Sequence, residues 1–164
     1  MKLTLETTIK SKPEMYDFGT QLAKLFSISD IITFDGDLGV GKTFLCKSII
    51  NNLTTINEVV SPTFNIVQTY PLQKDEEIWH CDFYRINNFE EVEEIGVFED
   101  FKKKIILLEW PKFKFELSEY HPLNINIEII SNNQSSLSEF RKISLSGSKK
   151  WDNKIKNLHN FLAL

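Results

Sequence analysis

Apolar side chains recur along the chain at two spacings, and each spacing predicts one kind of element. A three- or four-residue spacing, or a helix-start signal, predicts helices at residues 11–26, 42–53, 89–101 and 149–162. Short apolar or alternating runs predict strands at residues 31–35, 64–70, 78–84, 105–110, 124–130 and 141–147. Strands and helices are therefore interspersed along the chain, which predicts an α/β fold.

The two terminal helices carry clear signals. One stripe of the 11–26 helix contains Met15, Phe18, Leu22 and Phe26. One stripe of the 149–162 helix contains Trp151, Ile155, Leu158 and Leu162. Ser11 and Glu14 have the spacing of a capping box, in which a hydroxyl accepts a hydrogen bond from the backbone N–H three residues later. We therefore expect the first helix to begin directly after Ser11.

The order of the elements predicts a mixed sheet. The strand and helix within residues 31–53 form a βα unit, which favours parallel strands flanked by helices. The two strands within residues 64–84 are separated by a short polar turn, which favours an antiparallel hairpin. Asn87 or Asn88 is expected to cap the helix that follows. Residues 131–139 are polar and predict a loop between the last two strands.

Composition narrows the class of protein. A chain of 164 residues with 41% apolar and 26% charged residues suits one domain, residues 1–164. Its apolar runs are too short for a membrane span, and its N-terminus lacks the apolar stretch of a signal peptide. Its two cysteines do not form the pattern of a disulfide framework. These features predict a cytoplasmic protein. The net charge is −4, with acidic groups in excess up to residue 100 and basic groups afterwards, which argues against a protein that grips nucleic acid alone.

The segment GDLGVGKT, residues 36–43, fits the phosphate-binding pattern G-x-x-x-x-G-K-[ST] without a mismatch. It follows a predicted strand and opens a predicted helix, where glycines let backbone N–H groups surround an anion near the helix amino end. Lys42 would reach the β- and γ-phosphates, and Thr43 would place its hydroxyl on Mg²⁺. The pattern predicts a three-layer P-loop NTPase-like fold with a mixed, mostly parallel sheet between helices.

A P-loop site needs a further carboxylate for the metal. The strand at 105–110 is apolar until Glu109, at the strand end where ligands bind in α/β sheets, so Glu109 is the first candidate. Asp82 competes with it. Asp82 lies within HCDFYR, where strand alternation would place His80, Asp82 and Tyr84 on one face. Such a polar face is either solvated or directed toward a site.

Other residues bear on the kind of nucleotide. The sequence has no N-K-x-D motif for guanine, which favours adenine by elimination. Arg85 and Arg141 are the only arginines, whereas a small-molecule kinase usually closes a lid that carries several. The kinase interpretation is therefore disfavoured but stays open. Arg85 would be structural if it pairs with an acid of the 89–101 helix, and functional if it contacts the nucleotide.

Four motifs in order resemble the TsaE family, the ATPase of bacterial tRNA threonylcarbamoyladenosine synthesis. They are the 36–43 loop, SPTF at 61–64, HCDFYR at 80–85 and LLEW at 107–110. The resemblance covers about residues 11–147, which leaves the C-terminal helix outside the matched core. Together the motifs are far more specific than the phosphate loop alone.

The resemblance assigns roles to individual residues. It implies that Thr63 senses Mg²⁺ or the γ-phosphate, that Asp82 orients the attacking water or a water on Mg²⁺, and that Glu109 and Thr43 hold the metal. The implied nucleotide-binding residues are Asp37, Leu38, Gly39, Val40, Gly41, Lys42, Thr43, Thr63 and Arg141.

Two positions depart from the family pattern. Val40 stands where Ala is usual, and Met15 stands where the family tends to place a threonine near the base. The adenine contact at Met15 is therefore not implied. Trp110 is expected to pack near the site.

The resemblance also implies partners. TsaE proteins act with TsaB and TsaD, which carry threonylcarbamoyl transfer to adenosine 37 of tRNAs that read ANN codons, and ATP hydrolysis resets the complex between turnovers. The tRNA is then met only through the complex. The small number of arginines is consistent with slow hydrolysis by this protein on its own, because a partner can supply the positive charge that stabilises the transition state. Alternatives are a small-molecule kinase and a nucleotide-gated binding module that does not hydrolyse.

Overall fold

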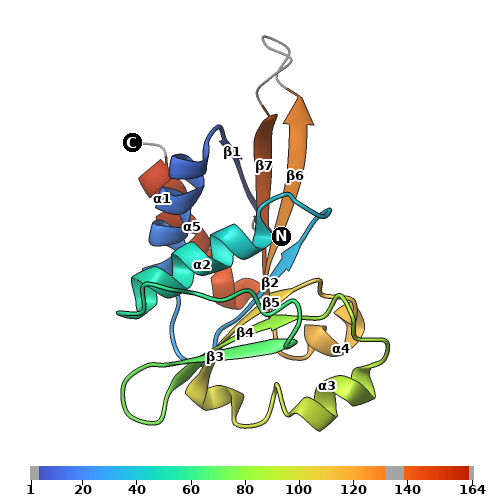
Figure 1. The fold of residues 1–164 in the computed structure, drawn as a ribbon. Coiled ribbons are helices and arrows are strands. Elements are labelled where there is room, and N and C mark those ends of the chain that lie inside the picture. Colours follow the sequence, from blue (N-terminus) through green and yellow to red (C-terminus); the bar gives the residue numbers. More distant parts are fainter. Residues whose placement is uncertain (1–3, 132–138, 163–164) are drawn as a thin grey trace.

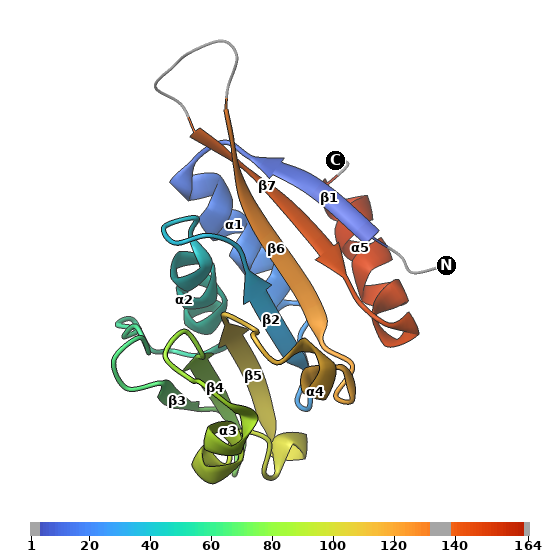
Figure 2. The ribbon, with the colours of Figure 1, turned by 90° about the vertical axis from the view of Figure 1, so that its right-hand side faces the viewer.

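A computed structural model describes residues 4–131 and 139–162. Its strands form one sheet in the order β1-β7-β6-β2-β5-β4-β3, seen face-on in Figure 2. Strands β6, β2, β5 and β4 are parallel to one another, and β1, β7 and β3 pair in antiparallel fashion. The strands are β1 (Thr4–Ile9), β2 (Ile31–Asp35), β3 (Val67–Pro71), β4 (Glu77–Asp82), β5 (Lys104–Glu109), β6 (Leu123–Ser131) and β7 (Glu139–Ser146).

Helices cover both faces of the sheet, which makes three layers (Figure 1). On one face α1 (Lys12–Ala23), α2 (Lys42–Leu53) and α5 (Asp152–Leu162) enclose the larger apolar core. On the other face α3 (Phe89–Ile95) and α4 (Lys114–Ser118) enclose a smaller core. The predicted fold class is confirmed. None of the helices in the described part of the chain is long and apolar enough to cross a membrane.

The caps act much as the sequence predicts. The Ser11 hydroxyl accepts a bond from the Glu14 N–H at 3.2 Å, while the Glu14 carboxylate accepts from the Lys10 N–H at 2.7 Å. Asn88 is the residue that caps α3, because its side chain accepts from the Glu91 N–H at 3.0 Å. Side-chain oxygens thus occupy backbone donors that a helix start leaves unpaired.

Several predicted boundaries are wrong. Strand β3 begins three residues later than residue 64, and β4 ends at Asp82, so Tyr84 leaves the strand face shared by His80 and Asp82. The helix predicted over 89–101 stops at Ile95 because Gly96 adopts a left-handed φ of 73° and its N–H bonds to the Glu93 carbonyl.

Further differences lie at the chain ends and in short elements. The first helix ends at Ala23 rather than at residue 26, and the last begins with the 3₁₀ turn η2 (Lys149–Trp151). A second 3₁₀ turn, η1 (Phe101–Lys103), leads into β5. Leu162 is 37% exposed and does not continue the buried stripe of α5. Strand β1 and helix α4 were not predicted, and most of the predicted 131–139 loop lies outside the described residues.

The sheet brings distant acids to one edge. Strands β2, β5 and β4 are adjacent and parallel, so their carboxyl ends lie side by side. In this register Phe34 pairs with Glu109, and Glu109 with Asp82. The segment that leaves β2 leads directly into α2, so the amino end of α2 lies at this edge.

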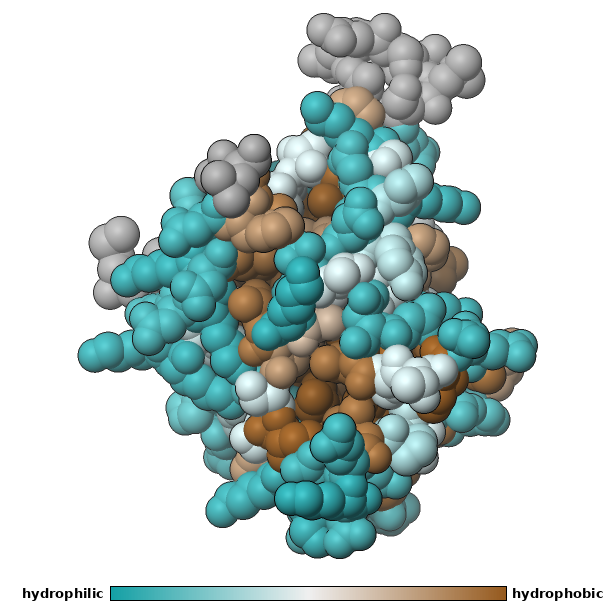
Figure 3. All heavy atoms as spheres, turned by 90° about the vertical axis from the view of Figure 1, so that its left-hand side faces the viewer, coloured by the Kyte–Doolittle hydropathy of each residue, from teal (hydrophilic) through white to brown (hydrophobic). Residues whose placement is uncertain are grey.

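The surface at the carboxyl end of α2 differs from the sheet edge with its acids at the amino end of the helix. The face that carries α1 and α2 shows apolar side chains between polar ones (Figure 3). A groove at the carboxyl end of α2 is lined among others by Phe26, Leu53, Leu72 and Ile105. This groove lies a helix length away from the segment at residues 36–43.

Candidate nucleotide site

The segment at residues 36–43 forms a glycine loop that leaves the helix amino end without a side-chain cap. Gly36, Gly39 and Gly41 have φ values of 132°, 80° and 112°. Gly41 is the N-cap of α2 and offers no side chain to the first N–H groups. These N–H groups and the helix dipole favour an anion at this position.

Gly36 could not be replaced by a larger residue without distortion. A Cβ placed there would lie 2.2 Å from the carbonyl oxygen of Ile127 on β6. At Gly39 the same construction meets no atom within 4 Å. The first glycine therefore permits close packing of the loop on the sheet, whereas the second provides the left-handed turn alone.

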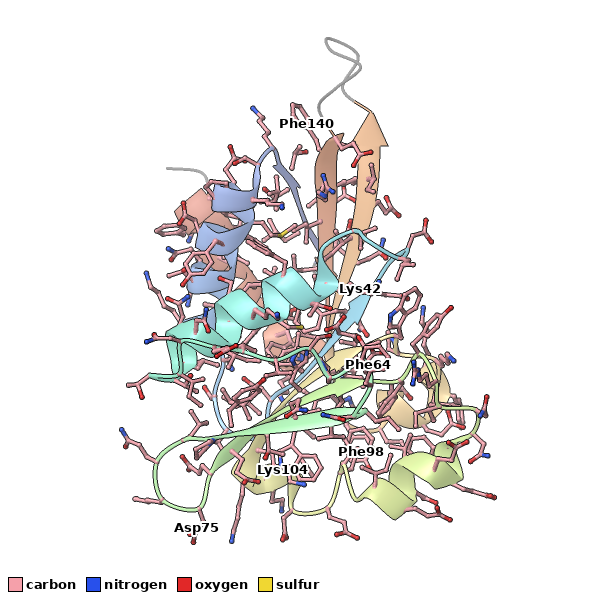
Figure 4. The ribbon with its side chains drawn as sticks, in the orientation of Figure 1. Lys42, Phe64, Asp75, Phe98, Lys104 and Phe140 are labelled. Carbon is pink, nitrogen blue, oxygen red and sulfur yellow. The ribbon has the colours of Figure 1, made fainter. Side chains whose placement is uncertain are left out.

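Lys42 points back into this loop. Its ammonium donates to the carbonyls of Gly36 at 2.7 Å and Asp37 at 2.8 Å, and lies 3.7 Å from the centre of the Trp110 ring. Figure 4 shows Lys42 at the amino end of α2. Burial lowers the pKa of Lys42, while the nearby carboxylates, Glu109 foremost, oppose that shift.

Thr43 and Glu109, which the sequence places 66 positions apart, are in contact. The Thr43 hydroxyl donates to Glu109 Oε2 at 2.8 Å. The other carboxylate oxygen, Oε1, lies 2.8 Å from Nε2 of His80 on β4. Glu109 is buried and His80 has no exposed surface. One carboxylate therefore joins the helix start to the neighbouring strand.

Asp82 lies beside Glu109 and is linked to the SPTF segment. Asp82 Oδ2 accepts from the Thr63 hydroxyl at 3.1 Å, and Oδ1 accepts from the Tyr84 N–H at 2.8 Å. The Thr63 and Ser61 hydroxyls lie 3.0 Å apart. The carboxylate is buried, with 4% of its residue surface exposed. The two strands thus present two carboxylates next to Lys42 and the loop.

The remaining residues of the predicted set surround the loop. Arg141 on β7 donates from Nε to the Val40 carbonyl at 3.3 Å, and pairs with Glu139 at 3.5 Å. Val40 is buried beneath the loop, whereas Leu38 is 83% exposed. Met15 is also buried, and its Cε lies 3.6 Å from a Cβ constructed on Gly41. Met15 therefore packs against the loop.

Arg85 does not act as an ion-pair partner for α3. Its guanidinium lies 4.9 Å from the centre of the exposed Phe64 ring. Within the ranges that the structure describes, Arg85 forms no ion pair. The structural pairing considered from the sequence is therefore wrong, and stacking on an aromatic ring takes its place.

Trp110 was expected to pack near the site, and the position of its ring over Lys42 confirms this. Two contacts of the site were not found by sequence reasoning, the His80–Glu109 bond and the proximity of Cys46. Trp110 has a left-handed φ of 59°, and its ring also packs 5.0 Å from that of Tyr84. Cys46 follows Thr43 by about one helical turn, so the two side chains lie on the same face of α2. This spacing is the signal from which the place of Cys46 near the site could have been predicted.

The chemistry of the donors fits magnesium. Thr43 and Glu109 offer oxygen atoms, which Mg²⁺ prefers. Cys46, His80 and Glu109 also bring one potential ligand atom each within 4.8 Å of one another. Burial raises the pKa of the Cys46 thiol well above its usual value, so the thiol keeps its proton. The oxygen pair is therefore the better metal site.

A separate cavity of about 820 Å³ lies over β2, β6 and β7 and is lined among others by Asp35, Lys114, Asn124 and Ser146. None of Lys42, Asp82 and Glu109 lines it. Its floor is the sheet face that faces away from α1 and α5, and polar residues are expected where no helix covers a sheet. We therefore place the site at the loop and not in this cavity.

The strand, glycine loop and helix, with parallel strands ending beside them, define a fold of the P-loop NTPase class. The family model described as "Threonylcarbamoyl adenosine biosynthesis protein TsaE" matches residues 9–140. The chain belongs to the TsaE family.

Curated relatives agree with this assignment, and one solved structure shares the fold. The chain is 37% identical over 128 residues to the tRNA threonylcarbamoyladenosine biosynthesis protein TsaE of Rickettsia prowazekii, a match that covers 77% of this chain and 88% of the relative. It is 31% identical over 144 residues to the TsaE protein of Aquifex aeolicus, covering 87% and 100%. The crystal structure of "Bacillus subtilus YdiB" shares the fold, with a TM-score of 0.71, 21% identity and coverage of 98% and 97%.

Proposed function

We propose that this protein is a Mg²⁺-dependent ATPase that serves tRNA threonylcarbamoyladenosine biosynthesis. Membership of the TsaE family supports the pathway. The observation that carries the ATPase proposal is the bond between Thr43 and Glu109 at 2.8 Å, next to a lysine held in the glycine loop. This arrangement has a cradle for phosphates and an oxygen-rich position for the metal.

Each residue of the loop has a task in the proposal. The backbone N–H groups of residues 37–43 hold the β- and γ-phosphates, and the Lys42 ammonium adds positive charge. Thr43 and Glu109 hold Mg²⁺, directly or through water. Bound there, the metal would neutralise charge that develops on the phosphate oxygens. Arg141 stabilises the loop through the Val40 carbonyl.

Asp82 is the proposed water-positioning group. It lies beside Glu109 in the sheet and is held by two donors, the Thr63 hydroxyl and the Tyr84 N–H. A carboxylate fixed in this way can accept a hydrogen bond from an attacking water and orient it toward the terminal phosphate. Thr63 would connect Asp82, and through it the attacking water, to the SPTF segment. A change in the conformation of that segment would then alter the rate of hydrolysis.

Partners complete the proposal. We expect homologues of TsaB and TsaD to bind this protein, and tRNA to be met through that complex. Adenine is proposed over guanine because the chain has no N-K-x-D motif. Two buried free cysteines fit a reducing compartment, and we propose the cytoplasm.

The test is phosphate release from ATP by three proteins. Asp82→Ala should bind ATP with unchanged affinity but lose turnover by roughly 100-fold or more, as expected for a lost water-positioning group. Asp75→Ala is the control, because Asp75 is an exposed acid at the tip of the β3–β4 hairpin, far from Lys42 (Figure 4). Hydrolysis by Asp82→Ala at the parent rate would show that the catalytic assignment is wrong.

The same assay separates the alternatives. A small-molecule kinase would consume ATP only with an acceptor and would yield a phosphorylated product. A nucleotide-gated binding module would retain its function in Asp82→Ala while Lys42→Ala abolished nucleotide binding. The ATPase proposal predicts Mg²⁺-dependent release of free phosphate without an added acceptor.

A further inference from the structure

His80 is a fully buried polar residue on a strand of the mixed sheet, between the parallel neighbour β5 and the antiparallel edge strand β3. It lies on β4, opposite Leu107 of β5 and Gln68 of β3. It is 0% exposed, and its neighbour along the strand, Cys81, is an apolar-core residue. A buried imidazole in such a position costs free energy unless its polar atoms find partners.

Only one end of the ring has a partner. Nε2 lies 2.8 Å from Glu109 Oε1, whereas Nδ1 is buried without a hydrogen-bond partner in the described structure. An ionised carboxylate can only accept, so Nε2 must carry the proton in this contact. Nδ1 has no partner, so the ring is held through Nε2 alone.

The contact restricts the Glu109 carboxylate. One oxygen, Oε1, is engaged by His80 on β4, and the other, Oε2, accepts from the Thr43 hydroxyl at the start of α2. The carboxylate is thus held at both ends, with Oε2 directed at the loop side. Packing alone would leave the plane of the carboxylate poorly fixed, because the terminal torsion of a Glu side chain has broad minima.

We propose that His80 is a positioning residue for the magnesium site, which orients Glu109 so that Oε2 faces the cation held with Thr43. This inference rests on the proposed function. Residues that hydrogen-bond to a metal ligand without contacting the metal typically tune metal affinity. Their loss lowers that affinity or the activity by about 10- to 100-fold. In the described part of the chain, His80 hydrogen-bonds to Glu109 and not to the loop or Lys42, so its effect passes through Glu109.

A positioning role differs from simple core packing because it requires an N–H donor at the place of the His80 Nε2 atom. Leucine fills a similar volume but offers no N–H to Oε1. The amide of glutamine reaches about as far along the side chain as Nε2 of histidine, whereas the amide of asparagine reaches only as far as Nδ1. A positioning role therefore predicts that glutamine replaces His80 better than asparagine or leucine.

The experiment measures binding of a fluorescent ATP analogue at increasing Mg²⁺ concentration. For His80→Leu and His80→Asn, the Mg²⁺ concentration that gives half of the metal-dependent gain in affinity should rise about 10- to 100-fold. His80→Gln should lie within a few-fold of the parent protein. Affinity measured in EDTA should be the same for all four proteins, since the loop and Lys42 are untouched.

Three results decide the matter. Equal Mg²⁺ dependence in the parent, Gln, Asn and Leu proteins would overturn the role of His80 and leave the proposed magnesium site standing. Failure of Mg²⁺ to alter nucleotide affinity in the parent would overturn both. Should His80→Leu not fold, as shown by lost binding in EDTA, the comparison of His80→Gln with His80→Asn gives the same decision.

Discussion

At the residue scale, the site depends on side chains whose partners are fixed by the backbone. Glu109 meets Thr43 because β5 ends where α2 begins, and it meets His80 because β4 pairs with β5. The phosphate motif predicted Lys42 and Thr43, since their roles follow from spacing within eight residues. The place of Trp110 near the site was also predicted, but the bond between His80 and Glu109 was not, because it joins two strands that only the folded sheet brings together.

Glycine at position 36 gives a prediction at this scale. Gly36→Ala should destabilise the protein by about 3 kcal/mol or more, because a positive φ costs about 1–3 kcal/mol and the Cβ would also overlap the Ile127 carbonyl at 2.2 Å. Gly39→Ala is the matched control, with a positive φ but open space, and should cost only about 1–2 kcal/mol. Urea unfolding monitored by circular dichroism measures both. Equal losses would contradict the close approach at Gly36.

At the scale of elements, segments with a strong local signal were predicted well and segments without one were missed. Helices α1 and α2 and strands β2 and β5 follow from local patterns and start signals. Strand β1 was missed because its partner β7 lies more than a hundred residues away, as in the pairing of Thr4 with Ser146. Local sequence gives no sign of such a partner.

Helix α5 shows how an element outside the family match is held. Trp151 is fully buried and donates from its ring N–H to the His121 carbonyl at 2.8 Å, and its ring packs edge-on against Phe26. Lys154 forms an ion pair with the buried Asp30 next to β2. Apolar packing and a buried acid therefore dock α5 on the sheet.

The docking of α5 can be tested by one substitution. Trp151→Ala should reduce the free energy of unfolding by about 3–5 kcal/mol, because it leaves a large cavity and an unpaired carbonyl. Lys156→Ala, at an exposed position on α5, which follows the η2 turn that ends with Trp151, should change it by no more than about 0.5 kcal/mol. Thermal unfolding compares the two. A loss below 1 kcal/mol for Trp151→Ala would mean that α5 adds little to the fold.

At the scale of the whole molecule, the fold alone does not give the task, because P-loop folds serve many functions. The family match supplies the pathway, and the sheet edge supplies the site. The proposal that hydrolysis serves a larger complex rests on the shortage of arginines in the chain. Arg85 stacks on Phe64, and Arg141 bonds to the Val40 carbonyl of the loop, so both guanidinium groups already have partners.

Partner proteins should raise the rate of ATP hydrolysis. Adding purified TsaB and TsaD homologues should raise phosphate release severalfold over the rate of this protein alone, because a partner would supply missing positive charge. In the same mixture with tRNA and an activated threonylcarbamoyl donor, threonylcarbamoyladenosine should form over repeated turnovers with the parent protein and not with Lys42→Ala. Nucleoside analysis of the recovered tRNA measures this. Equal modification with Lys42→Ala would mean that nucleotide binding plays no part.

The most direct test of the central claim is a crystal structure with Mg²⁺ and a non-hydrolysable ATP analogue. The account predicts β- and γ-phosphates within the loop at residues 36–43, with the metal next to Thr43 Oγ1 and Glu109 Oε2 and with Asp82 facing the terminal phosphate. A nucleotide bound elsewhere, or a terminal phosphate remote from both Glu109 and Asp82, would contradict it.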